Sequence, residues 1–222
     1  MTVLHLADEG EAADLAAFLS RLLHYDRGAA VRLQAHGTAL AVFGRPPSFE
    51  VLAVRAVRLA KPYENGLDVT VSAGELLESV DEPAATAAVP GAVTGPPWAG
   101  VLPPRGGWRP EPGLPSPDAL RALVSAAVAE FKSRIGELAP EKRTRAEFDR
   151  IGREIWSRTV ADTGLPVRAV HAAQSLGFLR PADPAGDGPA LVSSGAWLRL
   201  RTPYGSVALR RAGTGALGLS VR

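Results

Sequence analysis

The belt from Val89 to Pro117 is the part of the chain that most constrains its fold. It reads VPGAVTGPPWAGVLPPRGGWRPEPGLPSP. Proline fixes its own φ and lacks an amide donor, and glycine weakens regular elements, so we predict neither a helix nor a central strand across the belt. The chain therefore divides into an acidic α/β segment over residues 1–88, the belt over residues 89–117, and a basic segment over residues 118–222.

Charge is distributed unevenly along the chain, although the formal net charge is only +2. Residues 1–90 carry 7 Lys/Arg against 12 Asp/Glu, whereas residues 91–222 carry 18 against 11. Such a division favours docking of the two halves on each other, or a basic face for an anionic partner. The hydrophobic fraction of 46% is typical of a globular protein and argues against disorder along the whole length.

The chain contains no cysteine, which excludes disulfides, thiolate metal sites and cysteine nucleophiles. Its first residues carry acids where a signal peptide would be apolar, and no apolar run is long enough to cross a bilayer. We therefore expect a cytoplasmic protein without a membrane partner.

The first segment predicts a short strand at residues 2–6, followed by a helix. Asp8 and Glu11 have the spacing of a capping box, and an apolar stripe at helical spacing continues to about Tyr25. His36-Gly37 and Asn65-Gly66 are turn signals between short apolar runs, and Ser72 with Glu75 predicts a second helix. The predicted strands cover residues 30–35, 38–43, 49–59 and 67–71.

The basic segment predicts three helices and then a hairpin. Ser116 and Thr144 are N-cap candidates for the first two helices, and the third begins near Pro166 and ends at Gly177. The hairpin strands are Trp197–Arg201 and Ser206–Arg211. The predicted fold class is α+β: an N-terminal, mainly antiparallel sheet with helices, and a C-terminal helical segment ending in a β-hairpin. Whether the hairpin joins the N-terminal sheet stays open.

The hairpin suggests a nucleic-acid interface. Alternation in the run WLRLR places Trp197, Arg199 and Arg201 on one face, and three helices followed by a hairpin resemble a winged-helix module in outline. Ordinary solvated arginines on an antiparallel hairpin are the alternative. The residues predicted to contact phosphate or base edges are Arg168, His171, Gln174, Arg199, Arg201 and Arg210.

Trp98 and Trp108 in the belt suggest an interaction segment. Proline-rich segments with aromatic residues dock on protein partners, but two exposed indoles would leave much apolar surface in water. We therefore expect the belt to be an ordered strap along both halves.

Other motifs lack the context that their chemistry needs. Gly213, Gly215 and Gly218 match the spacing of a dinucleotide-binding loop, but no helix can follow within the remaining residues. The four histidines do not have metal-site spacing, and the acids near Asp8 suit the first turn of a helix. We predict no catalytic residue, no metal site and no cofactor.

These observations favour a non-catalytic interaction or scaffold protein with a protein partner. Nucleic-acid binding is the first alternative. A second alternative is a small-molecule or flavin-binding protein, because the order helix, hairpin and long strand resembles flavin-binding split barrels; the phosphate-binding cluster of that family is not evident. The oligomeric state stays open.

Overall fold

The computed structural model describes residues 2–96, 98, 102–181 and 188–211. The first half contains β1 (Val3–His5), α1 (Glu9–Tyr25), β2 (Ala30–Gly44), η1 (Pro47–Phe49), β3 (Leu52–Ser72), α2 (Ala73–Glu78), β4 (Val80–Asp81) and β5 (Thr86–Ala88). The second half contains β6 (Arg109–Glu111), α3 (Pro117–Gly136), η2 (Pro140–Lys142), α4 (Arg145–Trp156), α5 (Val167–Ser175), β7 (Ala190–Ser194), β8 (Trp197–Thr202) and β9 (Gly205–Arg210).

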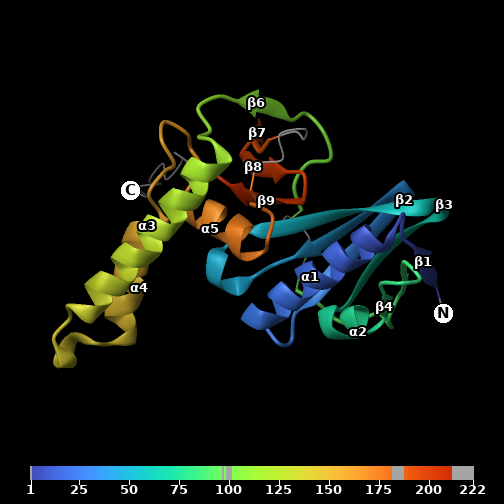
Figure 1. The fold of residues 1–222 in the computed structure, drawn as a ribbon, viewed down its shortest axis with the longest axis horizontal. Helices are drawn as coiled ribbons and strands as arrows, with labels where there is room; N and C mark the ends of the chain where they lie inside the picture. Colours follow the sequence, from blue (N-terminus) through green and yellow to red (C-terminus); the bar gives the residue numbers. More distant parts are fainter. Residues whose placement is uncertain (1, 97, 99–101, 182–187, 212–222) are drawn as a thin grey trace, which may run out of the picture.

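One antiparallel sheet unites the two halves of the chain (Figure 1). Its six strands follow the order β2-β3-β9-β8-β7-β6, and β9 pairs with β3 through Leu52↔Ala208 and Val54↔Ser206. The C-terminal hairpin therefore joins the N-terminal sheet, which answers the question that the sequence left open. A second, small sheet has the order β1-β5-β4. The predicted α+β fold class is confirmed.

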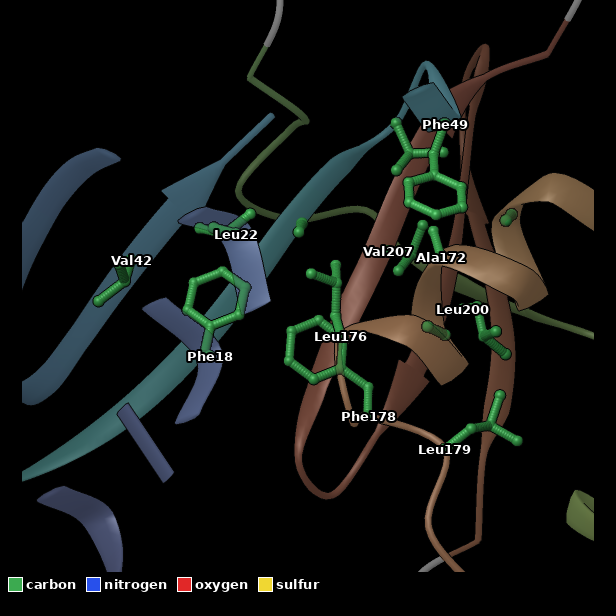
Figure 2. Packing of buried hydrophobic residues seen from close by; sticks show 14 of the residues in the cluster. Phe18, Leu22, Val42, Phe49, Ala172, Leu176, Phe178, Leu179, Leu200 and Val207 are labelled. Atoms are coloured by element: carbon green, nitrogen blue, oxygen red, sulfur yellow. The ribbon is translucent and has the colours of Figure 1, made fainter. Parts of the chain in front are cut away.

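Helices α1 and α5 cover the same face of the large sheet, and the main core lies beneath them. Figure 2 shows Phe18 and Leu22 of α1 on one side of the core, and Leu176 and Phe178, which follow α5, with Val207 of β9 on the other. The rings of Phe18 and Phe178 stack with their centroids 5.4 Å apart. Because these residues come from both halves, the main hydrophobic core joins the two halves of the chain.

The predicted helix starts are confirmed by their capping bonds. Asp8, Ser72, Ser116 and Thr144 each accept a hydrogen bond from the backbone amide three residues later. Such a bond satisfies an amide that has no partner within the helix. Gly177 follows α5 with a φ of 75°, so glycine allows the left-handed turn that ends this helix.

The predicted arrangement of the first strands is wrong, because β2 and β3 are each one long strand. β2 has 15 residues and β3 has 21, and they pair antiparallel along nearly their whole lengths. His36-Gly37 and Asn65-Gly66 lie where the register shifts, so the positive φ of Gly37 and Gly66 produces irregular pairing without reversing the strands. The chain reverses instead through η1, where a strand was predicted from residue 49.

Several short strands were not predicted, namely β4, β5, β6 and β7. Each has five residues or fewer, and β6 contains a proline. Such strands carry little periodic signal, and their pairing is decided by the neighbouring strand. Helices α3 and α4 form a hairpin that projects from the rest of the molecule (Figure 1).

No helix among the described residues has the length and apolar character needed to cross a membrane.

Candidate functional site

A groove with a volume of about 730 Å³ lies where the two halves meet, and we name it the seam groove. Five parts of the chain contribute to it: the loop after α1, the reversal between β2 and β3, the belt, the start of α5, and the paired ends of β8 and β9. Its lining comprises residues 28–30, 45–47, 50–52, 94–96 and 208–210, together with Asp26, Arg168 and Trp197.

Three arginines from three different elements line the seam groove. Arg45 follows β2, Arg168 lies in the first turn of α5, and Arg210 ends β9. Arg45 is exposed and has no hydrogen bond or ion pair with any described residue. The Nε of Arg168 is buried without a hydrogen bond, and the nearest carboxylate oxygen, Oε2 of Glu50, lies 3.7 Å away. Guanidinium groups with unused donors suit a carboxylate or phosphate ligand.

Two acids and one indole complete the polar part of the groove. Asp26 and Glu50 are exposed at its lining, and Trp197 is only 8% exposed. The guanidinium of Arg210 lies 5.3 Å from the centre of the Trp197 ring, within range of a cation–π contact. The arrangement therefore offers positive charge beside an aromatic wall.

A row of four aromatic rings lies beside one wall of the groove without lining it. Tyr25 contacts Phe49 at 5.1 Å between ring centroids, Phe49 contacts His171 at 5.1 Å, and His171 contacts Trp156 at 4.7 Å. Asp26 and Glu50 directly follow the first two rings, and Arg168 lies one helical turn before His171. The ring contacts therefore hold the charged residues of this wall in place.

Burial lowers the pKa of His171 below its ordinary value of 6.5. The folded state thus disfavours the protonated ring, and the unfolded chain binds a proton first as the pH falls. We expect the free energy of unfolding to decrease as the pH falls below about 6.5. His171→Phe keeps a ring between Phe49 and Trp156 and should weaken this dependence in urea titrations at several pH values. His36→Gln, at an exposed position, is the control, and an unchanged slope in His171→Phe would contradict the assignment.

The structure distributes the predicted nucleic-acid residues over the seam groove, the aromatic row, α5 and the β8–β9 hairpin. Arg168 and Arg210 both line the seam groove, whereas His171 lies in the aromatic row. Gln174 is half-buried on α5, and its Oε1 has no hydrogen bond among the described residues. Arg201 is exposed on β8.

Arg199 lies on the sheet face opposite the helices and is partly covered by the belt. Its Nε donates to Oγ of Ser206 at 2.8 Å, and its guanidinium lies 5.6 Å from the centre of the Trp108 ring. Burial, and secondarily the positive charge of Arg201, lower the pKa of Arg199. This arginine is therefore less available to an external phosphate than its sequence position suggests.

The two belt tryptophans lie against the same sheet face. Trp98 is 7% exposed and packs with Phe43, Leu52 and Val54, while its Nε1 donates to Oγ1 of Thr70 at 3.0 Å. Trp108 is half-buried, and its Nε1 donates to the carbonyl of Pro104. Two contacts thus bring described parts of the belt onto this face.

The acids of α1 belong to an ionic network with arginines from distant parts of the chain. We define the ionic network as Asp8, Glu11, Asp14, Arg55, Arg58 and Arg180. Arg55, whose side chain is 6% exposed, donates to Glu11 at 2.8 Å, to Asp14 at 3.3 Å and to the carbonyl of Tyr204 at 2.8 Å. Arg180 also donates to Asp14, and its guanidinium lies 4.0 Å from the centre of the Tyr204 ring. The network therefore ties α1 and β3 to the β8–β9 turn.

Sequence reasoning missed the most informative groove residues, Arg45 and Glu50, and also the ionic network. Arg45 stands before two prolines in a segment that reads as a turn, and the partners of Arg55 lie more than 40 positions away. No local pattern in the sequence indicates either arrangement. Among the described residues, no group of histidine and acid side chains could hold a metal ion.

Two family models match the chain. Residues 1–100 match the model described as "Domain of unknown function (DUF8010)", and residues 103–214 match the one described as "Domain of unknown function (DUF8185)". The comparison with curated proteins gave no match. The seam groove takes its lining from both matched regions. Because the second match covers more than half of the 222 residues, the protein belongs to the DUF8185 family.

Proposed function

We propose that this protein is a non-catalytic interaction protein, and that the seam groove receives a segment of a partner protein. The observation that supports the proposal is that both halves of the chain and the belt line the groove. A surface assembled from three distant parts of the chain is presented only by the folded whole, which suits a protein whose role is recognition.

The composition of the groove supports this role. Arginine and tryptophan are enriched among residues that dominate binding energy at protein interfaces, and Arg45, Arg168, Arg210 and Trp197 all line the groove. A volume of about 730 Å³ accommodates a few side chains of a peptide. Pro46 and Pro47 fix the backbone of one wall, which limits the entropy lost on binding.

A peptide-display selection tests the proposal, with the purified protein as bait. Thr94 is exposed and lines the groove, so Thr94→Trp should obstruct it. We expect the selected peptides to bind Thr94→Trp at least tenfold more weakly than the unmodified protein, a difference of about 1.4 kcal/mol. Fluorescence anisotropy measures the affinities.

The neighbouring position provides a matched control. Val93 is 38% exposed but does not line the groove, so Val93→Trp should leave peptide affinity within about twofold. The proposal fails if selection yields no peptide above background, or if the selected peptides bind the two tryptophan variants equally well.

A further inference from the structure

We propose that the segment bound in the seam groove is acidic, and that the carboxylate of Glu50 occupies the place of a ligand carboxylate in the free protein. This inference rests on the proposed function and names the chemistry of the partner. It concerns the arginines of the groove and the single acid that lies next to one of them.

The donors of Arg168 are only partly used in the free protein. Its Nε is buried and has no hydrogen bond, and the 3.7 Å separation from Oε2 of Glu50 is longer than a hydrogen bond. A buried donor without a partner is unfavourable, so a ligand oxygen at hydrogen-bonding distance would improve on the present arrangement. Arg45, which also lines the groove, has no partner among the described residues. Two guanidinium groups therefore have capacity for an added anion.

The carboxylate of Glu50 is a weak internal competitor of a ligand carboxylate for Arg168. Its side chain is 78% exposed, so the carboxylate can move into water without leaving a cavity. Its backbone has a φ of 52°, an uncommon conformation for a residue other than glycine, and Phe49 beside it is held in the aromatic row. The backbone thus stays fixed at this point while the side chain is free to leave Arg168.

The same charges favour an acidic peptide over a nucleic acid. A nucleic acid needs a continuous basic surface along its phosphates. The groove instead has acids among its arginines, with Asp26 and Glu50 at the lining, and the half-buried Arg199 lies outside it, against Trp108. A few carboxylates matched to separate guanidinium groups fit this pattern better than a row of phosphates.

Glu50→Gln provides the test, with the blocked peptide acetyl-(Glu-Gly)₃-amide as the probe and its glutamine counterpart as the neutral control. Removing the competing carboxylate is expected to tighten binding of the glutamate peptide about three- to fivefold, the range that an exposed ion pair can contribute. The glutamine peptide should bind neither protein. Isothermal titration calorimetry at low salt measures the affinities.

Glu78→Gln separates the local effect from a change in net charge. Glu78 is exposed on α2 and does not line the groove, so this variant should bind the glutamate peptide as the unmodified protein does. Equal tightening by both variants would overturn the role of Glu50. Equal binding of the glutamate and glutamine peptides would overturn the acidic class of ligand.

The outcomes distinguish this inference from the proposed function. If display yields groove-dependent peptides that are neutral, the interaction role stands and the acidic class is wrong. A single-stranded oligothymidine serves as a third probe. If it binds more tightly to Glu50→Gln while the glutamate peptide does not bind at all, the groove is a nucleic-acid site and the peptide proposal is overturned.

Discussion

Replacing Arg55 with alanine is expected to lower the free energy of unfolding by about 3–5 kcal/mol. The Arg55 side chain is nearly buried, and it donates to two carboxylates and to the carbonyl of Tyr204. Its removal would leave the carboxylate of Glu11, whose side chain is 11% exposed, with the exposed Arg58 as its remaining ionic partner among the described residues. Urea unfolding followed by circular dichroism measures the loss.

Arg58 provides the matched control within the same ionic network. It also bonds to Glu11, but its side chain is 71% exposed, so Arg58→Ala should cost much less stability than Arg55→Ala. Arg55→Lys keeps the charge but loses the planar fork that reaches three acceptors, and it should recover only part of the stability. Equal losses for Arg55→Ala and Arg58→Ala would show that burial of the network contributes little.

Replacing Phe178 with alanine is expected to cost about 3–5 kcal/mol, because it leaves a cavity in the core that joins the two halves. Phe178 is 2% exposed and stacks on Phe18 of α1. It also lies against Gly205, where an added Cβ would come within 2.5 Å of the ring. Gly205→Ala should therefore destabilise the protein by about 1–3 kcal/mol through this clash, in addition to the strain of a side chain at a φ of 153°.

A double-mutant cycle separates this contact from backbone strain. If the clash with the ring is the cause, Gly205→Ala should cost at least about 1 kcal/mol less in the Phe178→Ala background. Gly195→Ala is the control for strain, because Gly195 has a φ of 54° and an added Cβ would meet nothing within 4 Å. Strictly additive losses at Phe178 and Gly205 would contradict the predicted clash.

Arg55 and Phe178 both make contacts that hold the two halves of the chain together. Arg55 connects α1 and β3 to the β8–β9 turn, and Phe178 joins the same turn region to α1. Residues from both sides of this junction line the groove. Variants that loosen the junction should therefore also lower the affinity of any ligand that binds in the groove. Stability and peptide binding should therefore be measured on the same samples.

The helix starts could be predicted because their signals are local. Asp8, Ser72, Ser116 and Thr144 each have their capping partner three residues away, so a short window contains both donor and acceptor. The hairpin of β8 and β9 was predictable for the same reason, since its turn lies between two short alternating runs.

The candidate site was not predictable to the same extent. Arg168 and Arg210 were selected as nucleic-acid contacts, and the structure brings them together in the groove, but beside Arg45 and Glu50, which were not selected. His171 was selected as a nucleic-acid contact, and its ring lies between those of Phe49 and Trp156. In an arginine-rich sequence, the neighbouring residues do not indicate which guanidinium groups form ion pairs, which are buried and which stay exposed.

The sequence by itself determined the α+β class, the capped helices and the final hairpin, because each depends on residues only a few positions apart. The tertiary structure alone decided that β9 pairs with β3, that Arg55 meets the acids of α1, and that three distant arginines share one groove. These contacts join residues far apart in the chain. They form only when distant segments pack together on the large sheet. The periodic patterns of the sequence do not specify which distant segments pack together.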